Sequence, residues 1–92
     1  MDPVDIAASA LGETTAGLAR RLGVTKGAAH QWKKPKSIPE VHCVVIERDS
    51  VAKATCEQLR DDIVWVRVPD PAWPHPAGRP CIDVVATLSK AA

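Results

Sequence analysis

The sequence has no run of apolar residues as long as the roughly 20 that a membrane-spanning helix needs. Its first twelve residues, MDPVDIAASALG, carry aspartates where a secretory signal peptide would carry basic residues. We therefore expect neither a membrane span nor a targeting segment, and we expect a cytoplasmic protein. A chain of 92 residues leaves room for one small core.

The cysteines lack the spacing of a metal or redox site. Cys43, Cys56 and Cys81 are far apart, and none of them belongs to a C-x-x-C pair. In a reducing compartment such residues usually act as small buried hydrophobic side chains. A zinc site that adds His42 or His75 is the alternative, although the spacing does not support it. Nothing in the sequence marks an activating base or an oxyanion donor for a catalytic cysteine. From this and from the cysteine spacing we expect no enzyme, no metal and no cofactor.

Acidic residues are missing from a long central segment, since none lies between Glu13 and Glu40. Half of the twelve basic residues fall in this gap, whereas the rest of the chain holds the other six and all eleven acidic residues. The net charge of +1 therefore conceals a segment of +6 joined to a remainder of −5. Such asymmetry favours a polyanion as the partner. The basic residues of the gap are Arg20, Arg21, Lys26, Lys33, Lys34 and Lys36.

Capping residues divide residues 1–62 into four helices and a short fifth one. Asp2 and Pro3 are typical of a helix start, and Gly12 can take the left-handed conformation that ends a helix. Thr14 or Thr15 is expected to cap the second helix. In the fourth helix we expect Val41, Val44 and Val45, with Cys43, to form the apolar side. The expected helices span residues 3–11, 15–22, 26–34, 39–48 and 56–60.

The character of the chain changes after residue 62. Residues 63–68 and 81–86 are rich in β-branched side chains and predict two strands. The segment between them holds five of the eight prolines, which excludes a tight hairpin turn but allows antiparallel pairing around a long loop. A two-stranded ribbon is marginal alone, so we expect it to dock on the helices or on a second subunit, with a frayed end beyond it. We thus expect a helical domain at 1–62 and a β- and proline-rich extension at 63–92.

Residues 14–36 have the spacing of a helix-turn-helix. Leu18, Ala19 and Leu22 would face inward from the first helix of the motif, and Gly23 would supply the turn. Val24 would close the corner, followed by inward positions at Ala29 and Trp32. This combination of small, apolar and turn residues predicts two helices packed at a steep angle, the second of which fits a DNA major groove.

The outward positions of this motif are polar or basic. Gln31 can form paired hydrogen bonds with adenine, Lys26 can donate to guanine, and His30 can contact a base or a phosphate. Gly27 would let the backbone approach closely, and Thr15 would meet phosphate at the start of its helix. The lysines that follow would hold the backbone of the duplex. The predicted DNA-binding residues are Thr15, Thr25, Lys26, Gly27, His30, Gln31, Lys33, Lys34 and Lys36.

Each of these residues also has a purely structural interpretation. Trp32 fits the core better than a ligand site because its position faces inward. Arg20 and Arg21 are as compatible with a solvated helix face as with phosphate contacts, and His30 and Gln31 can be ordinary exposed polar residues. A three-helix packing unit without a DNA role is the general alternative, which the absence of acidic residues makes less attractive.

The C-terminal extension suggests two further roles. As a ribbon it would form a homodimer, because alternate valines of its first strand need apolar cover. As a pre-extended arm it would bind a protein partner, with Trp65 and Trp73 as anchors, unless Trp73 packs on the neighbouring prolines. The predicted dimerisation residues are Val64, Trp65, Val66, Val68, Ile82 and Val84.

Four segments in order, LARRLGV, AAHQW, IPEVHCVVIER and ATCEQLRDDIVW, resemble the Cro-like YdaS family of phage- and prophage-associated regulators, which are also described as antitoxins. The resemblance covers about residues 5–68, and the proline-rich tail beyond is an extension that many members lack. It implies a four- to five-helix domain like those of Cro and lambda repressor, dimeric, binding double-stranded DNA and regulating transcription.

Overall fold

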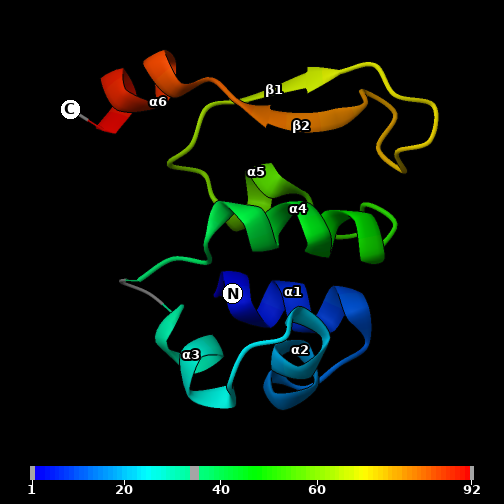
Figure 1. Ribbon diagram of the computed structural model, residues 1–92, viewed down its shortest axis with the longest axis vertical. Helices are drawn as coiled ribbons and strands as arrows, with labels where there is room; N and C mark the ends of the chain where they lie inside the picture. Colours follow the sequence, from blue (N-terminus) through cyan, green and yellow to red (C-terminus); the bar gives the residue numbers. More distant parts are fainter. Residues whose placement is uncertain (1, 34–35, 92) are drawn as a thin grey trace.

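The computed structural model describes residues 2–33 and 36–91 and is mainly helical, as expected. Figure 1 shows three tiers: a two-stranded ribbon with α6 at one end, α4 and α5 in the middle, and α1, α2 and α3 at the other end. None of the helices in the described ranges has the length and apolar character needed to cross a membrane. The elements are α1 (Pro3–Leu11), α2 (Thr15–Leu22), α3 (Lys26–Gln31), α4 (Glu40–Asp49), α5 (Cys56–Leu59), β1 (Trp65–Val68), β2 (Arg79–Ile82) and α6 (Val84–Ala91).

The predicted caps of α1 and α2 are confirmed. The Asp2 carboxylate accepts a hydrogen bond from the Val4 N–H at 3.0 Å, and Thr14 accepts one from Gly17 at 3.1 Å. Both helices end at a glycine in the left-handed region, with φ of 67° at Gly12 and 72° at Gly23. Because each cap satisfies main-chain groups that a helix end leaves without partners, local sequence fixes both ends of these helices.

The core lies between α1, α2, α4 and α5. Its largest fully buried apolar side chains include Val4, Leu18, Ile38 and Ile46, which come from three helices and from the segment before α4. At about 25 cal/mol per Å² of apolar area removed from water, such side chains supply most of the driving force for folding. Cys43 and Cys56 are buried with them, and burial raises the pKa of the Cys43 thiol to about 12.

The inward side of α4 differs from the prediction. Val41 is exposed, Val44 and Val45 are half-buried, and the stripe that faces the core passes through Cys43, Ile46, Glu47 and Ser50. These positions follow the i, i+3, i+4, i+7 spacing of a helix face. Of the predicted set, Cys43 is buried and Val44 packs against the core. The stripe itself includes a glutamate and a serine, which apolar spacing does not predict. The third helix is also shorter than expected, because it ends at Gln31 with Trp32 as its cap residue.

The two strands pair antiparallel, as predicted, with Trp65 opposite Ile82 and Arg67 opposite Pro80. The Asp83 N–H donates to the Val64 carbonyl at 2.9 Å, which makes that pair a hydrogen-bonded one. Because such pairs alternate along an antiparallel ladder, the pair of Arg67 and Pro80 is not hydrogen-bonded. Proline is tolerated at this position since its missing N–H leaves no ladder bond unmade.

The prediction of a strand at 81–86 is wrong in part, because β2 ends at Ile82 and Val84 begins helix α6. Asp83 causes the change: its carboxylate accepts from the Ala86 N–H at 3.0 Å, and its carbonyl accepts from Thr87 at 2.9 Å. An aspartate in this arrangement starts a helix despite the β-branched residues that follow it. The first strand likewise starts at Trp65 instead of residue 63. The end that was expected to fray is helical through Ala91.

Candidate nucleic-acid interface

A short turn joins α2 to α3 and fixes their relative position. Gly23 takes the left-handed conformation, and the Val24 N–H donates to the Ala19 carbonyl at 3.0 Å, which closes the corner. Leu18, Ala19 and Ala29 are buried where the helices meet. Thr25 then caps α3 by accepting from the Ala28 N–H at 3.1 Å. Of the other residues predicted to pack inward, Leu22 and Trp32 are half-buried against the core, and Val24 is half-buried.

The residues predicted to face outward from α3 are exposed and share one side of the helix. The described exposed positions are Thr25, Lys26, Gly27, His30 and Gln31. Gly27, His30 and Gln31 follow Lys26 by one, four and five residues, and this spacing places them next to one another on a helix surface. A Cβ atom at Gly27 would meet only the Thr25 hydroxyl, at 3.9 Å, so internal packing does not require glycine there.

Trp32 lies at the end of α3 and turns toward the interior. Its ring is half-buried, packs against the core, and lies 5.1 Å from the His42 ring of α4 at an interplanar angle of 32°. This contact ties the end of α3 to α4. It agrees with the core interpretation of Trp32.

The basic residues of the acid-free segment are not equivalent. The Lys33 ammonium lies 3.7 Å from the Asp5 carboxylate of α1, and the Arg21 guanidinium lies 3.2 Å from Glu13. Within residues 2–33 and 36–91, no ion pair involves Arg20, Lys26 or Lys36. Lys34, another predicted phosphate contact, lies outside the described residues. Thr15 is the first residue of α2, with Thr14 as the cap before it.

The ribbon divides the predicted dimerisation residues between its two faces. Val66 and Val68 point to solvent and are 44% and 37% exposed, whereas Trp65 packs against the core and its indole N–H donates to the Arg60 carbonyl at 3.0 Å. Val64 is half-buried, and its N–H donates to the Thr87 hydroxyl at 2.9 Å. Ile82 is half-buried on β2, and Val84 is exposed on α6 instead of on a strand.

The family model described as bacterial toxin YdaS matches residues 4–68, which is most of the chain. The chain belongs to the YdaS family. The match runs from α1 to the end of β1, so β2 and α6 lie beyond the part that the family model covers. No curated protein and no solved structure matches the chain.

Sequence reasoning missed a buried charged cluster that attaches the ribbon to the YdaS helices. Glu47 of α4 is fully buried, and both of its carboxylate oxygens accept hydrogen bonds from the Arg67 guanidinium at 2.6 Å. It also accepts from the Trp73 indole N–H at 2.6 Å and from the Cys56 N–H at 3.0 Å. Arg67 in turn contacts Glu57 of α5. We call Glu47, Glu57, Arg67 and Trp73 the ribbon cluster.

The hydrogen bonds of the ribbon cluster fix its charge state. Burial alone would raise the pKa of Glu47, but the hydrogen bonds from Arg67, Trp73 and the Cys56 N–H outweigh it and lower that pKa. The paired carboxylates raise the pKa of Arg67. A signal for this cluster existed in the sequence, because Arg67 interrupts a strand of apolar residues on the side shared with Trp65. We expected Trp73 to anchor a partner or to pack on prolines; its indole N–H donates to Glu47 of its own chain.

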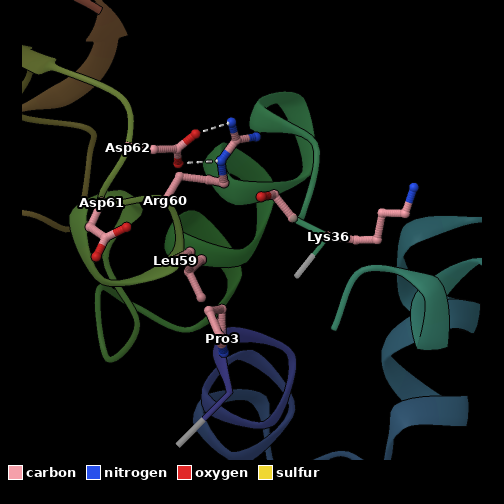
Figure 2. A pocket seen from close by; sticks show the side chains of 7 residues that line it. Pro3, Lys36, Leu59, Arg60, Asp61 and Asp62 are labelled. Atoms are coloured by element: carbon pink, nitrogen blue, oxygen red, sulfur yellow. Dashed lines mark hydrogen bonds and ion pairs between the residues drawn. The ribbon is translucent and has the colours of Figure 1, made fainter. Parts of the chain in front are cut away.

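A cavity of about 600 Å³ lies where the start of α1 meets the end of α5 (Figure 2). Its walls include Arg60, which forms two hydrogen bonds of 2.7 Å with Asp62 and one of 2.9 Å with the Ile38 carbonyl. Glu40 lies 3.6 Å from the same guanidinium. The charge of Arg60 is thus matched within the chain. The described residues contain no group of three His, Cys, Asp or Glu side chains that could hold a metal ion.

Proposed function

We propose that this YdaS-family protein is a sequence-specific DNA-binding regulator of the Cro-like type, with α2 and α3 as a helix-turn-helix. The observation that carries the proposal is the exposed side of α3, which presents Lys26, His30 and Gln31 together in a segment without acidic residues. An α-helix fits the major groove, and these side chain types make specific contacts with base edges there. The protein acts by occupying its site and catalyses no reaction.

The protein binds its operator as a homodimer in this proposal. Two copies would place their α3 helices one helical turn of DNA apart, about 34 Å, on a pseudo-palindromic site. The exposed Val66 and Val68 of the ribbon support a second copy as the cover of that face. Bound at a promoter in the cytoplasm, a dimer would repress by blocking polymerase.

The variant Lys26→Ala tests whether α3 contacts base edges and so recognises the DNA sequence. On a duplex selected from a random-sequence pool, it should weaken binding by about 1–3 kcal/mol and relax the preference at one base pair. Lys53→Ala is a matched control, because Lys53 is exposed in the turn between α4 and α5. Equal losses in the two variants would refute a reading role for Lys26.

A second candidate is a protein-interaction module of the toxin–antitoxin type, which the description of the family favours. The described aromatic rings of the extension are turned inward, so the partner surface would be the exposed valines of β1, Val66 and Val68. Replacing Val66 and Val68 by serine distinguishes the two roles of the ribbon. A monomeric variant that binds a single half-site assigns the ribbon to the dimer, whereas an unchanged dimer leaves that face for another protein.

A further inference from the structure

A second cavity, of about 520 Å³, lies beside the end of α3. Gln31 and Trp32 form one side of it, and Lys36 and Ser37 of the segment before α4 form the other. Its volume is within the range of pockets that hold a small ligand or a group of a larger one. Since Gln31 also belongs to the exposed side of α3, the cavity opens next to the surface proposed to enter the groove.

The lining of this cavity suits an anion. Its described lining residues supply a cation, an amide and a hydroxyl, and none of them carries a carboxylate. Lysine, glutamine and serine side chains all donate hydrogen bonds, and a phosphodiester has two charged oxygens that accept them. The half-buried ring of Trp32 adds an apolar wall of the kind that packs against a sugar.

Lys36 lines both cavities, but its ammonium group is directed away from the first one. Figure 2 shows the Lys36 side chain extending away from Arg60, Asp61 and Asp62. No ion pair within the described ranges involves Lys36, whereas Lys33 is held by Asp5 at 3.7 Å. Of the two lysines with described positions beside the end of α3, Lys36 is therefore the one whose charge is available to a ligand.

We infer that the cavity between α3 and the segment before α4 binds one phosphodiester group of the DNA backbone. Lys36 supplies the charge and Ser37 supplies a neutral hydrogen-bond donor, whereas Gln31, at the border of the cavity, remains assigned to the base edges. The inference rests on the proposed DNA binding. It adds a phosphate-binding site, which we call the phosphate seat. Because phosphate contacts position a protein without reading sequence, this site would fix the register of α3 in the groove. The sequence alone predicted the same role, contact with the DNA backbone, for Lys33 and Lys36; the inference assigns the phosphate contact to Lys36.

The test compares Lys36→Ala, Ser37→Ala and the control Lys53→Ala in the full chain. Binding to a selected duplex and to a scrambled duplex is measured between 50 and 200 mM salt. Each lost phosphate contact lowers the slope of log affinity against log salt by about 0.9, so the fall in affinity over this range should be about 3.5-fold smaller for Lys36→Ala. Ser37→Ala should weaken both duplexes equally and leave the slope unchanged. Lys53→Ala should behave as the unmodified chain.

The outcomes separate this inference from the proposed function. A Lys36→Ala variant with the slope of Lys53→Ala overturns the phosphate seat while leaving DNA binding intact. Loss of affinity for the selected duplex alone also overturns it, because Lys36 would then contact a base. An unmodified chain that binds neither duplex overturns both the seat and the proposed function. Equal weakening on both duplexes with the reduced slope supports the seat.

Discussion

Replacing Arg67 by methionine should detach the ribbon from the helices. Methionine keeps much of the length of arginine but removes the two 2.6 Å hydrogen bonds to Glu47, the contacts with Glu57 and the 3.1 Å bond to the Gly78 carbonyl. Glu47 would then remain buried as a carboxylate with only the N–H groups of Trp73 and Cys56 as partners. Removing one partner of a buried ion pair leaves the other charge buried without its counter-ion, and this destabilises a protein more than replacing both partners by apolar residues does.

The expected loss is about 3–5 kcal/mol of unfolding free energy, the range for removing one partner of a buried ion pair. For a domain of this size each kcal/mol lowers the melting temperature by about 4–8 °C, so the transition should fall by at least about 12 °C. Glu47→Gln should cost less, about 2 kcal/mol, because Arg67 keeps the half-exposed Glu57 as its partner. The double variant should lose less than the two single losses together, since both residues act in one interaction.

Urea unfolding followed by circular dichroism and by tryptophan fluorescence would measure the free energies, and a thermal scan would measure the melting temperatures. Arg79→Met is the matched control, because Arg79 lies on β2, is 53% exposed and approaches Asp70 only to 3.9 Å. Its loss should stay below about 0.5 kcal/mol. If Arg67→Met lowers the unfolding free energy no more than Arg79→Met does, the ribbon cluster does not stabilise the attachment of the ribbon to the helices.

Glu47 of the ribbon cluster and three other features lead to four further predictions. The lowered pKa of Glu47 means that its contribution is present above the ordinary value near 4.5 and lost as pH falls through the folded value, so Glu47→Gln should flatten acid unfolding. Val51→Gly should raise stability by about 0.5–1 kcal/mol in the same assay, since Val51 is 68% exposed and has a φ of 53°, which suits glycine better. Gly78→Ala should cost about 3 kcal/mol, because φ is 101° and a Cβ would clash with the Val68 carbonyl oxygen of β1. Asp5→Asn should release Lys33 and steepen the salt dependence of DNA binding by about 0.9.

The parts of the fold that sequence reasoning predicted are those with local causes. The caps at Asp2, Thr14 and Thr25, and the left-handed turn at Gly23, depend on residues within five positions along the chain. Local capping residues therefore predict both ends of α1 and α2 and the start of α3 without reference to tertiary contacts. The exposed side of α3 followed from helix spacing alone.

The parts that sequence reasoning missed depend on distant residues or on a competing local signal. Glu47 and Arg67 are 20 positions apart, and only the folded chain places them together. Burial of a glutamate on α4 runs against the usual preference of charged residues for solvent, so apolar spacing predicts the buried position of Cys43 but not those of Glu47 and Ser50. At the C-terminus the Asp83 cap outweighed the β propensity of Val84 and Val85. A capping residue was thus more informative than propensity in a short segment.

The affinity of the full chain for selected and scrambled duplexes, measured against salt, tests the central claim most directly. We expect a complex on the selected duplex that is at least about 1000-fold tighter than on the scrambled one and that weakens as salt rises. Lys26→Ala should narrow this ratio. Weak binding that ignores sequence, or no binding at low salt, would contradict the assignment of α3 as a DNA-reading helix.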